Sequence, residues 1–152
     1  MPERDVDPTQ LFNDLVRVET ELWNAVDQRL RSDHGLPLSW FEPMQVVDRL
    51  ESGRVGEIAA ALRITVGGAS KLSGRIERAG YMHRRPASND RRATEIALTE
   101  AGRKKLAEAE TTHRAELERR LGRALPQSSL RQLGSALRRL REASVGAEVS
   151  AA

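Results

Sequence analysis

Apolar residues recur at intervals of three and four along residues 8–34, which is the spacing of one face of an α-helix. Asp7 stands where an N-cap is needed, and Gln10, three residues later, can close a capping box. Gly35 is a stop signal directly after the pattern, so we expect a long helix over residues 8–34. Its narrow apolar seam consists of Leu11, Leu15, Val18, Leu22, Val26 and Leu30.

A second helix is predicted to begin at Ser39, because Ser39 and Glu42 have the spacing of another capping box. The stretch from Glu51 to Gly53 interrupts the apolar pattern, so the helix should end close to residue 50. The apolar residues of this helix are Met44, Val46, Val47 and Leu50.

Two shorter helices joined by a tight turn are predicted next. Residues 56–62 carry apolar side chains on one face, and Thr65 is a favourable N-cap for the helix that follows. That helix should run to about Ala79, with Gly80 as its stop. Two short helices connected in this way are typical of a helix-turn-helix. We expect the inward face of the second one to consist of Val66, Ala69, Leu72 and Ile76.

A β-hairpin is predicted after these helices. Residues 81–85 form a strand-like run, and residues 86–90 consist almost wholly of turn formers. Arg91 and Arg92 follow the turn, so the hairpin would be a wing that carries two arginines near its tip. The second strand is indicated by the alternation of Thr94, Ile96 and Leu98.

The C-terminal part of the chain is predicted to form two more helices. Thr99 caps a long one, and Pro126 begins another with an apolar stripe at heptad-like spacing. The seams of residues 8–34 and 126–142 suit packing against a further helix, which from spacing alone can belong to the same chain or to a second copy. Residues 143–152 are small and polar, and we expect them to be disordered.

Composition excludes several classes of function. The chain has no cysteine, which rules out disulfides, thiol catalysis and cysteine-ligated zinc. His34, His83 and His113 lie far apart in the sequence, and no catalytic motif is present, so we expect neither an enzyme nor a metal or cofactor. The charged N-terminus is not a signal peptide, and no apolar run reaches membrane-spanning length. A cytoplasmic protein is therefore expected.

Positive charge is concentrated in one part of the sequence. Residues 63–92 contain eight lysines and arginines against two acidic residues, a net charge of +6, while the whole chain carries only +3. A basic segment in an otherwise acidic chain is typical of a protein that binds a polyanion, although a solvated charged face has the same composition. A winged module that binds proteins is a further alternative, but it would not need a basic helix and an arginine-tipped hairpin.

Several short motifs occur in a familiar order. They are Gly56-Glu-Ile-Ala-Ala-Ala-Leu62, the segment Thr65 to Gly80, Arg84-Arg-Pro86, Asp90-Arg-Arg92 and Leu98-Thr-Glu-Ala-Gly102. In this order and spacing the chain resembles the MarR (multiple antibiotic resistance regulator) family. The resemblance implies one mainly α-helical domain over residues 1–152. Its winged helix-turn-helix lobe, with the small β-hairpin wing, would span residues 39–98. Residues 8–34, 126–142 and part of 99–121 would form dimerisation helices.

The resemblance also implies a function. Members of this family are homodimers that bind palindromic operators in double-stranded DNA, usually repress a nearby gene and are often released by a small ligand. The recognition-helix residues that meet DNA would be Thr65, Gly67, Gly68, Ser70, Lys71 and Arg75. In the wing, Arg92 would enter the minor groove with Asp90 as its orienting partner. Arg84, Arg85 and Arg91 would contact phosphates.

Two glycines depart from the family pattern. Gly67 and Gly74 stand where relatives often have polar side chains, and each glycine destabilises a helix interior by roughly 1 kcal/mol relative to alanine. Close approach of the backbone to DNA, a helix that becomes firm only on binding, and relaxed constraint are three interpretations. Under either of the first two interpretations fewer side chains can read bases, and the glycines of this helix thereby favour the alternative function, a low-specificity or architectural DNA-binding protein.

A pocket for a planar aromatic or anionic effector is the remaining candidate site. In the family it lies between the dimerisation helices and the DNA-binding lobe. Aromatic rings with a polar edge suit such a ligand, and ordinary core packing of the same side chains is the alternative. The candidate residues are Trp23, His34, Trp40, Phe41 and Met44. His113 is expected at the surface.

Overall fold

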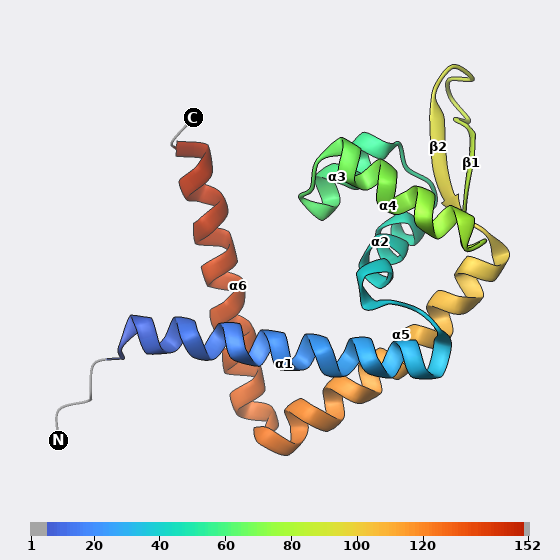
Figure 1. Ribbon diagram of the computed structural model, residues 1–152. Coiled ribbons are helices and arrows are strands. Elements are labelled where there is room, and N and C mark those ends of the chain that lie inside the picture. The colour runs from blue at the N-terminus through green and yellow to red at the C-terminus, as the bar shows by residue number, and fades with distance from the viewer. Residues whose placement is uncertain (1–5, 151–152) are drawn as a thin grey trace, which may run out of the picture. The chain divides into compact units, whose positions relative to one another are not determined.

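A computed structural model describes the backbone of residues 6–150 and the side chains of residues 6–143. The described residues form six helices and one two-stranded antiparallel sheet, so the predicted mainly α-helical fold with a hairpin wing is confirmed (Figure 1). The elements are α1 (Pro8–His34), α2 (Leu38–Arg49), α3 (Val55–Leu62), α4 (Val66–Arg78), β1 (Met82–Pro86), β2 (Thr94–Leu98), α5 (Glu100–Ala124) and α6 (Gln127–Ser150).

The chain divides into two compact units, Met1–Arg114 and Ala115–Ala152. The boundary falls inside α5, which is one continuous helix, rather than in a loop. The helix-turn-helix and the hairpin lie wholly within the first unit. That the chain forms a single domain stays a prediction.

The first helix begins as predicted but with a different set of contacts. The Asp7 carboxylate accepts a hydrogen bond from the Thr9 backbone N–H at 2.9 Å, so Asp7 is the N-cap. The predicted capping box is wrong, because Gln10 donates to the Asp14 carboxylate at 2.9 Å and does not reach back to the cap. Asp14 lies one turn further along the helix, and the Gln10 side chain bonds to it instead of to the N-cap backbone.

Helix α2 begins one residue earlier than predicted. Pro37 is its N-cap residue, and Ser39 lies inside the helix, so the predicted capping box at Ser39 is wrong. The Leu38 N–H instead donates to the Asp27 carboxylate of α1 at 2.8 Å. Burial opposes the charge of Asp27, but hydrogen bonds from Leu38 and Arg31 outweigh it and lower the Asp27 pKa. A carboxylate distant in sequence thus provides the hydrogen-bond acceptor for a backbone N–H at the start of α2.

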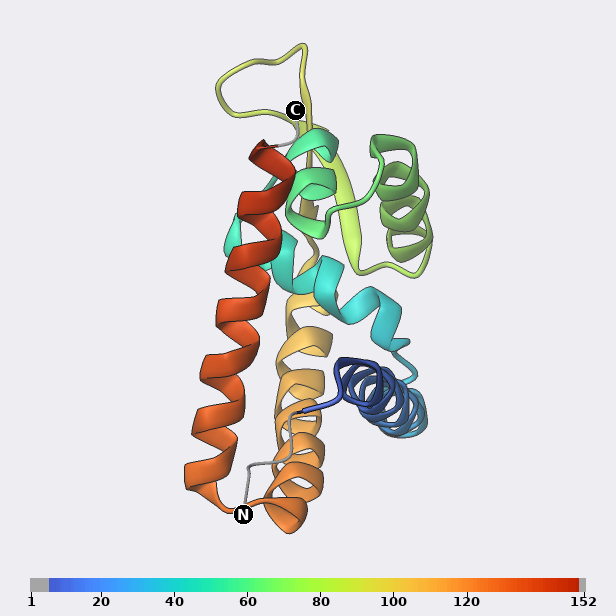
Figure 2. The same ribbon diagram turned by 90° about the vertical axis from the view of Figure 1, so that its left-hand side faces the viewer.

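Helix α2 forms the centre of the first unit. It lies between α1 and the α3–α4 pair in both ribbon views (Figures 1 and 2). Its side chains interdigitate with those of the surrounding helices and of β2, which removes a continuous apolar surface from water. The largest fully buried side chains are Val26, Leu30, Leu36, Met44, Val46, Val47, Ile58, Ile76, Met82, Ile96 and Leu98.

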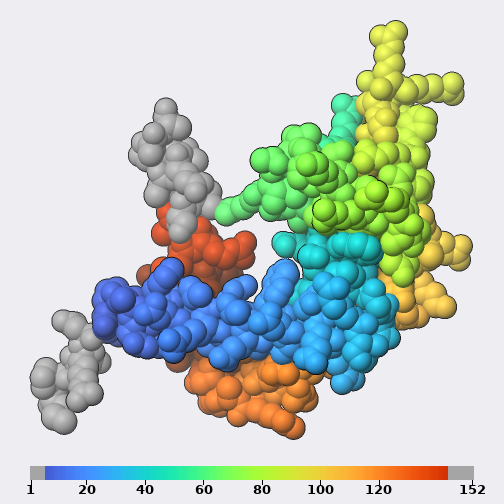
Figure 3. All heavy atoms as spheres, in the orientation of Figure 1, coloured from blue at the N-terminus to red at the C-terminus, as the bar shows by residue number. Residues whose placement is uncertain are grey.

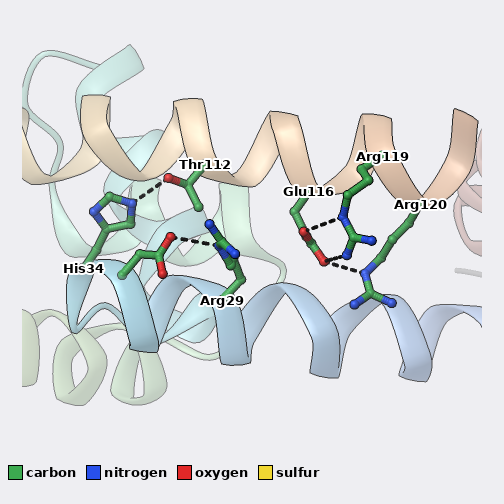
Figure 4. Close-up of polar contacts among 7 residues, drawn as sticks. Arg29, His34, Thr112, Glu116, Arg119 and Arg120 are labelled. Atoms are coloured by element: carbon green, nitrogen blue, oxygen red, sulfur yellow. Dashed lines mark hydrogen bonds and ion pairs between the residues drawn. The ribbon is translucent and has the colours of Figure 1, made fainter.

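The second unit consists of the end of α5 and helix α6. On α5, the Glu116 carboxylate accepts hydrogen bonds from Arg119 at 2.7 Å and from Arg120 at 2.6 Å (Figure 4). These two bonds lower the pKa of Glu116 to about 2. Helix α6 continues to Ser150, so the prediction of a disordered tail from residue 143 is wrong up to that point.

Candidate nucleic-acid interface

Helix α4, the predicted recognition helix, begins at the predicted cap. The Thr65 hydroxyl accepts a hydrogen bond from the Gly68 N–H at 3.0 Å, and the Thr65 backbone is extended. A Cβ at Gly68 would come within 3.1 Å of the Thr65 hydroxyl oxygen, so glycine at this position favours the cap. Thr65, Val66 and Gly67 are exposed, so N–H groups of this first turn that lack a partner within the helix are accessible to a phosphate.

The inward face of α4 differs from the prediction. Ala69 and Ile76 are buried as expected, and Ser73 is buried with them. Val66, predicted to face inward, is 57% exposed. As the first residue of α4, Val66 precedes the part of the helix that packs on α2 and α3.

The outward face of α4 is a line of cations and glycines. Gly67, Lys71, Gly74 and Arg78 follow one another at intervals of four, three and four, which places them along one side of the helix. Arg75 lies beside this line, and the side chains of Lys71, Arg75 and Arg78 are exposed. Arg78 had no predicted role, although its spacing of seven residues from Lys71 places it on the same side of the helix. Ser70 is half-buried at the edge of this face.

The two glycines on this line have no packing function in the free protein. A Cβ added at Gly67 or at Gly74 would meet no atom within 4 Å. Neither residue has the positive φ angle that favours glycine. The protein interior therefore does not require glycine at either position. The absence of a side chain can affect only what binds to the outward surface of the helix.

The hairpin that follows α4 is the predicted wing. Its strands pair in the register Met82 to Leu98 through Pro86 to Thr94, and it projects beyond α3 and α4 (Figures 1 and 3). At the tip, the Asp90 carboxylate accepts a hydrogen bond from the Arg92 backbone N–H at 3.0 Å. Asp90 thus orients Arg92 through its main chain. The side chains of Arg91 and Arg92 are exposed.

Arg84 and Arg85 differ from the tip arginines because carboxylates lie beside them. Arg84 binds Glu77 of α4 at 3.1 Å, and Arg85 lies 3.9 Å from Glu95 of β2. The first of these pairs ties the wing to the recognition helix. Neighbouring negative charge offsets both guanidinium groups, so their assignment as phosphate contacts stays a prediction.

The Leu-Thr-x-x-Gly motif, residues 98–102, holds the start of α5 against the end of α4 through hydrogen bonds. Thr99 accepts from the Gly102 N–H at 2.9 Å, and its hydroxyl donates to the Gly80 carbonyl at 2.6 Å. A Cβ at Gly102 would collide with the carbonyl oxygen of Tyr81. Glycine is therefore required here, because the chain leaving α4 crosses directly over the first turn of α5.

The five candidate pocket residues occupy different environments. Phe41 and Met44 are buried core side chains, Trp40 is half-buried, and Trp23 is 45% exposed on α1. His34 is half-buried, and its Nε2 lies 2.6 Å from the Thr112 hydroxyl (Figure 4). Core packing therefore accounts for Phe41 and Met44, and a shared effector pocket stays a prediction.

His113 is not the surface residue that was predicted. Its ring stacks on Phe41 with a centroid separation of 4.5 Å, and the side chain is half-buried. Burial lowers the pKa of His113, and the negative charge of Glu110 opposes this shift only in part. Helical spacing on α5 could not show this contact, because Phe41 is far away in the sequence.

No known family model and no curated protein matches the sequence, whereas solved structures do. The transcriptional regulator AbsC of Streptomyces coelicolor, a MarR family member, is 22% identical with a TM-score of 0.80, covering 95% of this chain and 99% of AbsC. A mutant of Escherichia coli MarR in complex with operator DNA is 18% identical with a TM-score of 0.78, covering 86% and 93%. CouR of Rhodococcus jostii bound to p-coumaroyl-CoA is 23% identical with a TM-score of 0.70, covering 83% and 87%. This chain therefore has the winged helix-turn-helix fold of the MarR-type transcriptional regulators.

Proposed function

We propose that this protein is a MarR-family transcriptional regulator that binds double-stranded DNA sequence-specifically as a homodimer. The observation that carries the proposal is the outward face of α4, where exposed Lys71, Arg75 and Arg78 alternate with glycines. A helix with this surface can enter the major groove, where cations reach phosphates and guanine edges. The wing, which Arg84 ties to the helix, brings Arg92 to the adjacent minor groove.

Exposed apolar side chains support the homodimer. Phe12, Val16 and Trp23 on α1 are large, apolar and 45–65% exposed, and Leu133 and Leu137 are exposed on α6. On each of the two helices, several large exposed apolar side chains of this kind mark an interaction site. A second copy is the occupant that also suits DNA, since a two-fold dimer presents two recognition helices to a palindromic operator.

The finer parts of the proposal concern regulation. We propose repression as the outcome and a small aromatic or anionic effector as the releasing signal. CouR, which has a similar fold, was solved with p-coumaroyl-CoA bound. None of the helices in the described part of the chain is both long and apolar enough to span a bilayer.

Low-specificity DNA binding is the second candidate, and the two glycines on the outward face of α4 favour it. Without side chains at positions 67 and 74, fewer groups can read base edges. Non-specific binding rests on phosphate contacts, so its affinity falls steeply with salt and does not depend on sequence.

Binding of labelled duplexes by wild type and single alanine variants tests the proposal. Lys71→Ala and Arg75→Ala should both weaken binding, and a base-reading residue should lose roughly 1–3 kcal/mol at its preferred sites only. Lys104→Ala removes an exposed cation from α5 and is the matched control. If all three variants bind every duplex as the wild type does, the outward face of α4 is not the interface.

A further inference from the structure

The turn between α3 and α4 contains an arginine in the left-handed backbone region. Arg63 has φ 54° and ψ 42°. Around it, the Ile64 N–H donates to the Ala59 carbonyl at 3.1 Å, and the Arg63 N–H donates to the Ala60 carbonyl at 3.2 Å. These two bonds are those of the Schellman motif, in which this position is usually glycine because a Cβ meets the following carbonyl.

At the ends of α1 and α4 the same chain meets the same requirement with glycine, whereas Glu51 after α2 is a second non-glycine residue with positive φ. Gly80 ends α4 with φ 85°, and the bonds around it have the same pattern, from Tyr81 N–H to Ile76 and from Gly80 N–H to Glu77. Gly35 ends α1 with φ 64°. Glycine is also common in helix-turn-helix connections. An arginine at the strained position indicates that its side chain has a use, since backbone strain of this kind collects at functional sites.

The Arg63 side chain is available for an external partner. It is exposed, and within the described residues it makes no ion pair and no side-chain hydrogen bond. The carboxylate of Glu57, in the first turn of α3, accepts a hydrogen bond from the Arg54 N–H at 2.7 Å. Arg63 also stands two residues before Thr65, the cap of the recognition helix.

We propose that Arg63 is a further DNA contact, which binds a backbone phosphate where α4 enters the major groove. This inference rests on the proposed function. A guanidinium can bind a phosphate through two parallel hydrogen bonds, and such a contact fixes the position of the helix without reading sequence. The phosphate contact in the complex then compensates for the left-handed backbone strain of Arg63.

Arg63→Gly tests the inference because it should move two measurements in opposite directions. The melting temperature should rise by roughly 2–4 °C as the left-handed strain is relieved. Affinity for operator-containing DNA should fall by about tenfold on all sequences alike. The slope of log affinity against log salt should become shallower by about two, one for each copy in the dimer.

Two further variants separate the causes. Glu51 is the other non-glycine residue with positive φ in the described part of the chain, at 60°, so Glu51→Gly should raise the melting temperature without loss of affinity. Arg63→Lys keeps the charge but not the two parallel hydrogen bonds, so it should keep the wild-type salt slope and lose less affinity than Arg63→Gly.

The outcomes distinguish the two proposals. If the wild type binds DNA and Arg63→Gly binds with equal affinity and an equal salt slope, Arg63 is not a contact, while the proposed function stands. If Arg63→Lys binds as weakly as Arg63→Gly, the phosphate contact is also overturned. If the wild type binds no DNA at any salt concentration, the proposed function fails and this inference fails with it.

Discussion

Replacing Gly74 by alanine should stabilise the free protein and weaken its binding to DNA. Gly74 lies in the interior of α4, where an added Cβ meets no atom within 4 Å. Alanine at such a position stabilises a helix by roughly 1 kcal/mol, because glycine loses more backbone freedom on folding. For a chain of this length the melting temperature should rise by roughly 2–4 °C.

The effect on binding follows from the position of Gly74 between Lys71 and Arg78. A methyl group there extends about 1.5 Å from the backbone, toward the surface that would face the DNA. If the helix backbone lies against the duplex, the misfit should cost about 1–3 kcal/mol, as overpacking does in a protein core. Affinity should then fall by roughly 5- to 150-fold.

Thermal unfolding followed by circular dichroism and fluorescence anisotropy with a labelled operator measure the two effects. Gly122→Ala in α5 is the matched control, since a Cβ at Gly122 also meets no atom within 4 Å. It should stabilise the protein and leave DNA binding unchanged. An unchanged affinity for Gly74→Ala, with the expected rise in melting temperature, would refute close approach as the reason for this glycine.

Three other perturbations test other parts of the structure. Gly102→Ala should lower the melting temperature by several degrees in a thermal melt, because its Cβ collides with the Tyr81 carbonyl; an unchanged melt would contradict the crossing described here. The stability of the wild type to urea should be full above about pH 6.5 and decrease below it, since burial lowers the pKa of His113 and the unfolded chain takes up the proton first. His113→Leu should flatten this dependence, and an equally steep one would exclude His113 as its origin. Arg92→Ala should lose most affinity at sites with a narrow A·T-rich minor groove, measured by anisotropy on matched duplexes, and an unchanged preference would remove Arg92 from that role.

The sequence was sufficient wherever a structural feature depends on a few adjacent residues. Thr65 as a cap and Gly80 as a stop follow from backbone chemistry that each residue carries itself. The hairpin follows from alternation on both sides of a run of turn formers. These features place the recognition helix and the wing, so the elements of the candidate interface could be predicted.

Features that depend on contacts between residues far apart in the sequence could not be predicted. Asp27 satisfies the start of α2 from another helix, which a search for a local cap at Ser39 could not find. Glu77 pairs with Arg84 across the turn that leads into the wing, and Glu95 lies beside Arg85. Two predicted DNA contacts therefore have carboxylate neighbours. The left-handed conformation of Arg63 is also invisible in the sequence, because arginine rarely adopts it.

Selection of bound sequences from a random duplex pool, at near-physiological salt, tests the central claim most directly. A dimeric regulator with two recognition helices should recover an inverted repeat whose half-sites lie about one helical turn apart. Recovery of no motif, together with binding that disappears as salt rises, would contradict sequence-specific recognition and favour the low-specificity alternative.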